Sequence, residues 1–137
     1  MRISARAAYA SIAVLELAFL YQTGPVKTRE IADRQGIPLK FLEQILHQLR
    51  SAGLVESIRG AGGGYVLARP PAEINLRQVV EAVEGELRIL DLEIEEETVR
   101  RVWEEVQGSV QRLLEGITLK DLVERRLAHR GALNFEI

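Results

Sequence analysis

A glycine-rich segment at residues 54–68 limits what this chain can fold into more than any other part of it. Two short apolar runs, 54–58 and 65–68, enclose a stretch with four glycines and Arg59. β-Branched and aromatic residues on both sides of a glycine turn are typical of an antiparallel hairpin. Glycines supply no side chains for a core, and they allow the backbone to approach another surface closely. We therefore predict a hairpin with a slim, exposed tip.

A nucleotide-binding glycine loop is the alternative for this segment. Such a loop lies between a strand and a helix, and its backbone amides hold phosphates at the start of that helix. Here the glycines are followed by residues 65–68, which have the pattern of a second strand. The hairpin is therefore the favoured interpretation.

Two helical patterns precede the hairpin. Residues 28–35 form the first, with Thr28 as the expected N-cap, and Gly36 supplies the left-handed residue that closes such a helix. The second pattern covers residues 38–52, and its proline lies in the first turn, where a missing N–H costs little. Helix, turn, helix and glycine-tipped hairpin together are the layout of a winged helix-turn-helix. DNA is therefore the first partner to test.

The helix expected at residues 38–52 has a clearly divided surface. Its apolar residues recur at helical spacing and predict a buried face, made of Leu42, Ile45, Leu46 and Leu49. A turn of about 100° per residue places polar side chains opposite them, namely Lys40, Glu43, Gln44, His47 and Ser51. Side chains of these types contact phosphates and base edges in the major groove, although any solvated helix face has a similar composition. We predict DNA contacts from Lys40, Glu43 and Gln44, with His47 either a phosphate contact or a plain surface residue.

The distribution of charge along the chain is consistent with DNA binding by its N-terminal half. Residues 1–70 hold nine basic and five acidic residues, a net charge of +4, and residues 71–137 hold nine basic and fifteen acidic residues, a net charge of −6. The overall charge of −2 therefore conceals a basic half that suits phosphate. Within that half, Arg59 stands beside the slim hairpin tip, where an arginine suits insertion into a narrow minor groove.

Three further helices are predicted around this unit. Each begins at a polar residue of a type that caps helices, and the first has apolar residues around most of its circumference, as expected for a helix buried on several sides. The caps and approximate spans are Ser4 for residues 5–22, Asn75 for residues 76–84, and Thr118 with Asp121 for residues 119–127.

A heptad pattern dominates the C-terminal half. Its apolar residues are spaced alternately by four and three positions, namely Val99, Trp103, Val106, Val110, Leu113 and Ile117. A seam of this kind can pack on its own domain or on a second copy. A second copy also supplies the two-fold symmetry of an inverted-repeat operator, so we predict that these residues form a homodimer interface. The preceding residues 85–95 are ambiguous, and residues 86–90 are a candidate extended segment.

The predicted fold is therefore mainly α: a winged helix-turn-helix with a small two-stranded wing and a long C-terminal dimerisation helix. We divide it into a DNA-binding domain at residues 1–84 and a dimerisation helix with a C-terminal extension at residues 85–137.

Composition disfavours several other classes of function. The chain has no cysteine, which excludes disulfides, thiolate zinc sites and cysteine-ligated iron–sulfur clusters. Its two histidines are far apart in sequence, and we recognise no nucleophile–base arrangement, so we expect no enzyme, metal or cofactor. The apolar run at residues 12–21 is too short to cross a bilayer and contains Glu16. With no recognisable secretion signal, we expect a cytoplasmic protein without membrane contact.

Short motifs at residues 1–4, 41–44, 53–55, 57–60, 62–65 and 117–122 carry a family likeness. Together they resemble the Rrf2 family of bacterial transcription regulators along nearly the whole chain. The resemblance implies a homodimer whose long C-terminal helices cross between protomers, with the recognition helix in the major groove and the wing arginine in the minor groove. With the wing glycines included, the predicted DNA-binding set is Lys40, Phe41, Glu43, Gln44, Arg59, Gly60, Gly62 and Gly63.

Iron is the main departure from the family pattern. Many Rrf2 proteins hold an iron–sulfur cluster through three cysteines before the dimerisation helix, and the equivalent residues 85–95 contain none. Among cysteine-free members, the chain is most similar to the regulators of cysteine metabolism in Gram-positive bacteria. The similarity covers a short acidic linker and residues 101–103 and 135–137. That branch takes its signal from a complex with a cysteine-synthase enzyme, which makes such an enzyme a candidate partner.

The leading hypothesis is a homodimeric, sequence-specific DNA-binding transcription regulator, and specifically a repressor. One alternative is a winged-helix module that binds a protein instead of DNA, which the acidic C-terminal half permits. Another is a DNA regulator controlled by a small molecule bound between the wing domain and the dimerisation helices. Binding that weakens steeply with salt indicates DNA, and thermal stabilisation that depends on ligand concentration indicates a small molecule.

Overall fold

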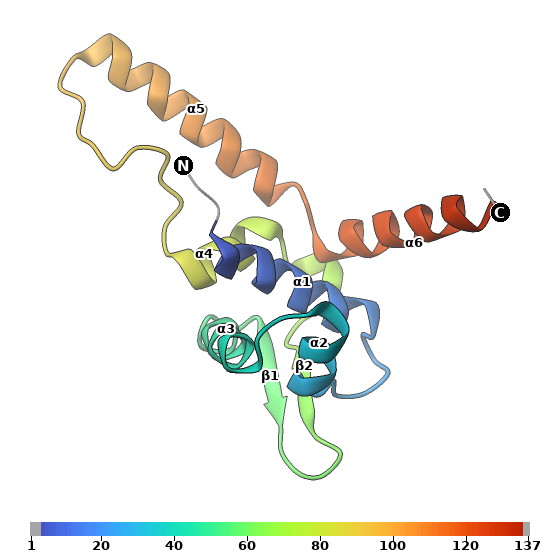
Figure 1. Ribbon diagram of the computed structural model, residues 1–137. Helices are drawn as coiled ribbons and strands as arrows, with labels where there is room; N and C mark the ends of the chain where they lie inside the picture. The colour runs from blue at the N-terminus through green and yellow to red at the C-terminus, as the bar shows by residue number, and fades with distance from the viewer. Residues whose placement is uncertain (1–3, 136–137) are drawn as a thin grey trace.

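The computed structural model describes residues 4–135, and the prediction of a mainly α winged helix-turn-helix is confirmed (Figure 1). In chain order, the elements of this part are α1 (Ala5–Phe19), α2 (Thr28–Gln35), α3 (Leu39–Ser51), β1 (Val55–Ile58), β2 (Gly64–Leu67), the short 3-10 helix η1 (Pro71–Glu73), α4 (Leu76–Glu84), α5 (Glu97–Glu115) and α6 (Leu119–Phe135).

Helix α1 is the centre of the body, and α2, α3, α4, α6 and β2 all contact it. Apart from Glu16, its buried face consists of small and aliphatic residues, which allows neighbouring helices to approach closely. The predicted core face of α3 is confirmed, because Leu42, Ile45, Leu46 and Leu49 are fully buried. Leu119, at the start of α6, belongs to the same cluster of buried side chains. One core thus includes residues on both sides of residue 84. The predicted division into a DNA-binding domain and a dimerisation region at that residue remains a prediction about function.

Strands β1 and β2 form the predicted antiparallel hairpin, in which Val55 pairs with Leu67 and Ile58 with Gly64. A third segment joins it. The N–H of Val26 donates to the Tyr65 carbonyl at 2.9 Å, and the Tyr65 N–H donates to the Val26 carbonyl at 2.8 Å. This reciprocal pair ties β2 to the loop between α1 and α2, so the hairpin has a fixed direction relative to the helices. We call residues 55–67 the wing.

Local capping explains several helix boundaries. The Ser4 hydroxyl accepts from the Arg6 N–H at 3.2 Å, and Gly36 closes α2 with a left-handed φ of 67°. Asn75 and Gln78 form a reciprocal capping box at the start of α4. Thr118 and Asp121 do the same for α6, and the hydrogen bond that Asp121 accepts from the Thr118 N–H lowers the pKa of this carboxyl.

Several predicted boundaries were wrong. Helix α1 ends at Phe19 and does not reach Gln22, since residues 20–23 turn back and Gln22 adopts a left-handed φ of 68°. The N-cap residue of α2 is Lys27, which makes no side-chain capping bond, and Thr28 is the first residue of the helix. Pro38 is the N-cap residue of α3 and lies outside its first turn. Helix α6 continues to Phe135, beyond the predicted end near Leu127.

The segment before α5 has no strand, so the expectation of an extended segment at residues 86–90 was wrong. Side chains satisfy its backbone in place of a sheet partner. The Leu87 N–H donates to the Glu81 carboxylate at 2.9 Å, and the Ile89 N–H donates to the Gln107 side chain at 3.2 Å. Gln111 in turn donates to the Leu87 carbonyl at 3.3 Å. This loop therefore lies along α5, to which these hydrogen bonds join it.

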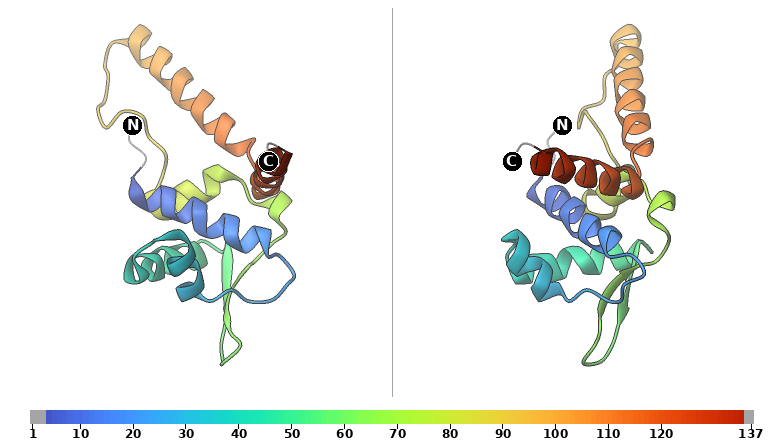
Figure 2. Two further views of the ribbon diagram at one scale, coloured as in Figure 1. Left: turned by 45° about the vertical axis from the view of Figure 1, so that its right-hand side comes forward. Right: turned by 90° about the vertical axis from the view of Figure 1, so that its right-hand side faces the viewer.

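Helix α5 projects from the body at the end opposite the wing (Figures 1 and 2). It ends at Glu115, so Ile117 lies beyond the helix to which the heptad pattern assigned it. The following turn pairs with the start of α4, where the Leu76 N–H donates to the Ile117 carbonyl at 2.8 Å. An Arg77–Glu115 ion pair reinforces this junction and raises the pKa of the arginine. No helix within residues 4–135 combines the length and the apolar character needed to cross a membrane.

Candidate nucleic-acid interface

Helix α3 presents its polar face to solvent. Lys40, Glu43, Gln44 and His47 are all exposed, on the side opposite the buried leucines and isoleucine. With Arg6 and Gln48, they line a shallow depression of about 540 Å³. Cation, carboxylate and amide groups here offer the donors and acceptors that base edges and phosphates require. Contact between these residues and DNA remains a prediction. Such contact requires that they lie together on one open face, as they do here.

Arg6 is a residue that the sequence reasoning missed. It lies in the first turn of α1, and its guanidinium lies 5.8 Å from the centre of the Phe41 ring. The packing of α1 on α3 therefore brings a second cation beside Lys40 and Gln44. A basic residue in the first turn of a helix is disfavoured by the helix dipole, which is the one local indication that Arg6 has another role.

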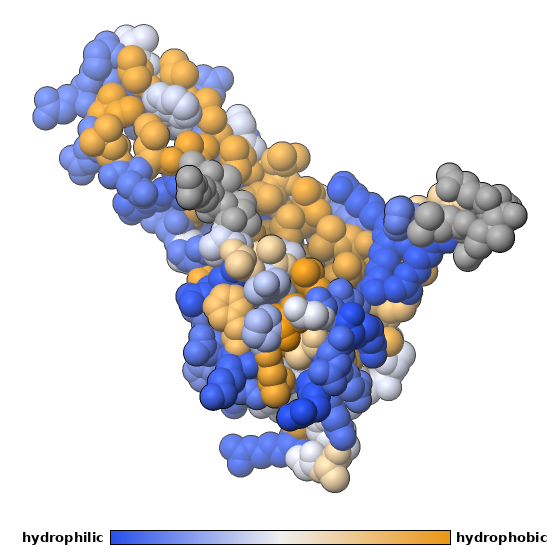
Figure 3. Space-filling view, viewed as in Figure 1, coloured by the Kyte–Doolittle hydropathy of each residue, from blue (hydrophilic) through white to orange (hydrophobic). Residues whose placement is uncertain are grey.

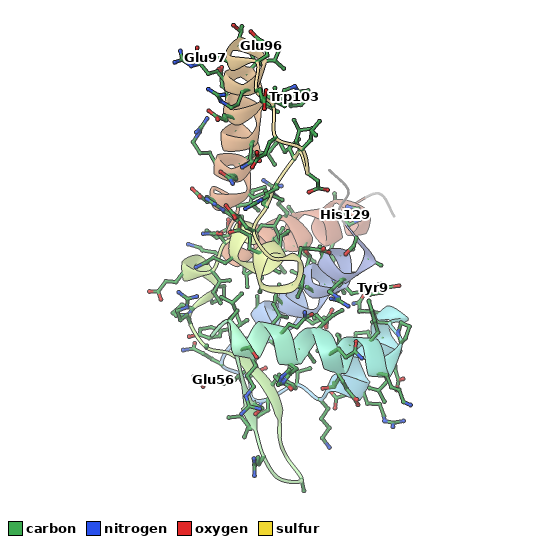
Figure 4. The ribbon with its side chains drawn as sticks, turned by 90° about the vertical axis from the view of Figure 1, so that its left-hand side faces the viewer. Tyr9, Glu56, Glu96, Glu97, Trp103 and His129 are labelled. Carbon is green, nitrogen blue, oxygen red and sulfur yellow. The ribbon has the colours of Figure 1, made fainter. Side chains whose placement is uncertain are left out.

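Phe41 lies differently from its polar neighbours. It is half-buried, and its ring meets Tyr9 edge to face with ring centres 5.5 Å apart. Figure 4 shows Tyr9 on α1 beside the start of α3. Phe41 therefore holds the start of α3 against α1, and its predicted DNA contact is limited to the part of the ring that remains exposed.

The wing extends away from the helices and carries Arg59 on its exposed tip (Figure 1). Its glycines have different structural roles. A Cβ on Gly62 would meet nothing within 4 Å, whereas a Cβ on Gly63 would lie 2.1 Å from the Ile58 carbonyl oxygen. Gly60 has a φ of 109°, which side chains rarely adopt, and its carbonyl accepts from the Gly63 N–H at 3.0 Å. Gly60 and Gly63 therefore shape the tip that presents Arg59, and Gly62 leaves its surface open.

We expect Gly63→Ala to distort the wing and Gly62→Ala to leave it intact, because only the first methyl group collides with backbone. The expected loss for Gly63→Ala is about 1–3 kcal/mol of unfolding free energy. Urea unfolding of both variants measures it. Equal stability of the two would contradict this description of the tip.

Helix α5 carries an apolar face that the described residues 4–132 leave partly exposed. Trp103 is 40% exposed, Val106 39% and Leu113 66%, and Val99 and Val102 are also exposed. Val110 packs against the core instead. We call Val99, Val102, Trp103, Val106 and Leu113 the α5 face, and Figure 3 shows apolar surface along this helix. Val102 was missed because it lies outside the strict four–three spacing, although it is one turn from Val99 and Val106.

A cavity of about 470 Å³ lies between α5 and the loop before it. It is lined from the loop by Ile89, Leu90, Leu92 and Ile94 and from α5 by Trp103, together with charged residues of both segments. Figure 4 shows Trp103 on the side of the helix that the loop follows. Control by a small molecule bound between the wing domain and the dimerisation helices remains a prediction, and this cavity lies instead between α5 and the loop before it.

A helix-turn-helix with an open polar recognition face and an arginine-tipped wing defines a winged helix-turn-helix DNA-binding protein. Residues 3–125 match the Rrf2 family, described as an iron-dependent transcriptional regulator. The chain belongs to this family, and it is a DNA-binding transcription regulator and not an enzyme.

Relatives cover nearly the whole chain. It is 36% identical over 138 aligned positions to the HTH-type transcriptional regulator CymR of Bacillus subtilis, with 100% of both chains covered. It is 38% identical over 133 positions to the putative HTH-type transcriptional regulator NMA1593 of Neisseria meningitidis, covering 92% of this chain and 90% of that one.

Solved structures agree. The structure of CymR, the global cysteine regulator of B. subtilis, has a TM-score of 0.84 at 34% identity and covers 91% of this chain and 98% of that one. That of T. potens IscR has a TM-score of 0.80 at 37% identity and covers 92% of this chain and 88% of that one.

The iron in the family description does not fit the residues of this chain. Iron–sulfur clusters are held by thiolates, and the sequence has no cysteine. Within residues 4–135, no three side chains of the histidine, aspartate and glutamate types lie together as metal ligands. The loop before α5 instead contributes isoleucine and leucine side chains to the cavity. The residues before α5 therefore do not fit an iron–sulfur cluster.

Proposed function

We propose that the protein is a homodimeric repressor that binds an inverted-repeat DNA site. The observation that carries this proposal is the position of the exposed surfaces at opposite ends of the body. The polar face of α3 and the wing lie at one end, and the α5 face lies at the other (Figure 1). A copy bound through α5 therefore leaves both DNA-facing surfaces free.

Self-association through α5 follows from its exposed side chains. Five large apolar residues on one side of a helix cost free energy in water, and burial returns about 25 cal/mol for each Å² removed from solvent. Two identical helices that cross with these faces together generate a two-fold axis. That axis would relate the two α3 helices and hence the two halves of an inverted repeat.

In the proposed complex, α3 enters the major groove and the wing enters the adjacent minor groove. Lys40, Glu43 and Gln44 would contact base edges and phosphates, and Phe41 would contact the groove through its exposed edge. Gly60, Gly62 and Gly63 would allow the wing backbone to approach the sugar–phosphate backbone. Arg59 would lie in the minor groove, where negative potential concentrates.

Arg59→Ala tests this assignment. We expect it to weaken binding to the preferred site by about 1–3 kcal/mol, roughly fivefold to 150-fold, because a groove-inserted arginine is lost. Fluorescence anisotropy with a labelled duplex measures the change. The matched control is Arg88→Ala, an exposed arginine in the loop before α5. Wild-type affinity in the Arg59 variant would contradict the minor-groove role.

We further propose that the regulated genes belong to cysteine or sulfur metabolism and that the protein acts on DNA in the cytoplasm. Support comes from the relative named the global cysteine regulator and from the likeness along the whole chain. A cysteine-synthase enzyme is the proposed partner. Adding that purified enzyme should tighten DNA binding at fixed repressor concentration, and unchanged affinity would exclude it as a co-regulator.

A further inference from the structure

Glu16 is a buried carboxylate to which the sequence reasoning gave no role. It lies on α1, is 1% exposed, and within residues 4–132 it is the one charged residue that is buried. Its carboxylate accepts from Arg34 at 2.7 Å and from Gln35 at 2.8 Å, both on α2. Arg126 on α6 forms an ion pair with it at 3.0 Å. One side chain thus joins three helices.

Packing alone does not require a charge at this position. Removing a carboxylate from water costs several kcal/mol, and a leucine there would fill the space without that cost. The charge is compensated only when both oxygens meet their partners, and those partners come from α2 and α6. Any other placement of α6 relative to α2 would therefore leave a buried charge without its partner, which costs free energy. Apolar contacts can form in several arrangements and do not impose this cost.

Arg126 is itself held firmly. Its side chain is 17% exposed, and its guanidinium lies 4.8 Å from the centre of the Phe19 ring. Arg130, one turn further along α6, lies 5.0 Å from the same ring. Two guanidinium groups of α6 therefore contact the same aromatic ring of α1, and these contacts favour one rotation of α6 about its own axis.

The placement of α6 matters because α5 is joined to it by the short turn at residues 116–118. In Figures 1 and 2, α1 lies between α2 and α6, and α5 leaves the body beside the start of α6. In a dimer formed through α5, a small rotation of this junction moves the partner's α3 by a larger distance, since α5 is a long arm. Together with the Leu76–Ile117 hydrogen bond and the Arg77–Glu115 ion pair, the Glu16 contact would therefore help to set the separation of the two recognition helices.

We propose that Glu16 and Arg126 are positioning residues that set the half-site spacing of the DNA site. The proposal rests on the proposed dimeric function. Half-sites read by one dimer lie about one helical turn apart, and each added base pair rotates a half-site by roughly 35°, so a rigid dimer tolerates little change in spacing. A dimer with a loosened α6 would accept neighbouring spacings as well.

The test uses Arg126→Met, which keeps the apolar stem and removes the charge. Duplexes carry the inverted repeat selected by the wild-type protein, with its central spacer changed by zero, one or two base pairs. We expect the ratio of affinities for the best spacing and for a two-base-pair change to fall about tenfold in the variant. The affinity for a single half-site should stay within about twofold of wild type.

Two further variants complete the design. Arg125→Met, an exposed neighbour on α6, should keep the wild-type ratio. Glu16→Gln, which keeps shape and removes the charge, should reduce the ratio as Arg126→Met does, and it serves if the latter fails to fold. A wild-type ratio in a folded charge-removing variant would overturn the positioning role while leaving the proposed function intact. If the wild-type protein selects no inverted repeat, the proposed function itself fails.

Discussion

Val106→Glu is expected to turn the dimer into a monomer and to lower affinity for the inverted repeat by about a hundredfold or more. Val106 lies in the middle of the α5 face, one turn from Val102 and Trp103. A carboxylate buried there would have no partner, and such burial costs several kcal/mol. Separate protomers would then bind each half-site without the gain of a second attached site.

Sedimentation equilibrium measures the first effect, and titration of a labelled inverted repeat measures the second. Glu105→Gln is the matched control, since Glu105 is exposed on the same helix and lies outside the α5 face. A Val106→Glu protein that sediments as a dimer would show that α5 is not the interface. Monomers with wild-type affinity would show that the DNA site needs only one copy.

Glu16→Ala is expected to reduce the free energy of unfolding by about 3 kcal/mol, because it leaves the charge of Arg126 largely buried without its counter-ion. Arg34 is half-exposed and can turn to water, so Arg126 accounts for most of the loss. The loss should appear as a lower urea midpoint with an unchanged slope.

Glu30→Ala is the control for this prediction, because Glu30 is an exposed carboxylate on α2. Its removal should change stability by less than about 0.5 kcal/mol. A Glu16→Ala protein as stable as this control would mean that the buried ion pairs contribute nothing net to the fold.

Periodicity and capping made the helix-turn-helix, the hairpin and α4 predictable from sequence. The leucines and isoleucine of α3 recur at helical spacing, and glycines at residues 60–64 allow little except a turn. Asn75 and Gln78 form the reciprocal pair that begins α4. In each case the residues that determine the helix or turn lie within the same short stretch of sequence.

Contacts between distant segments were not predictable in this way. Nothing near Glu16 in sequence indicates that Arg126 meets it, and the bond pair between Val26 and Tyr65 joins residues 39 positions apart. Arg6 reaches the α3 face only through the packing of α1 on α3. These contacts depend on tertiary structure, where local spacing carries no information.

The heptad pattern at residues 99–117 was informative about exposure and misleading about length. It marked an apolar side of α5, yet Val110 packs on the core and Ile117 lies in the next turn. Gly116 and the capping pair of Thr118 and Asp121 end one helix and begin another. The boundary between α5 and α6 is therefore set by these capping residues and not by the heptad spacing.

The most direct test of the central claim is selection of genomic DNA fragments by the purified protein at about 150 mM salt, followed by sequencing. The same selection with Arg59→Ala provides the matched comparison. We predict enrichment of one inverted-repeat motif by the wild-type protein and marked loss of that motif with the variant. A wild-type protein that enriches no inverted-repeat motif would contradict a sequence-specific dimeric regulator, and equal enrichment by the variant would contradict the role of Arg59 alone.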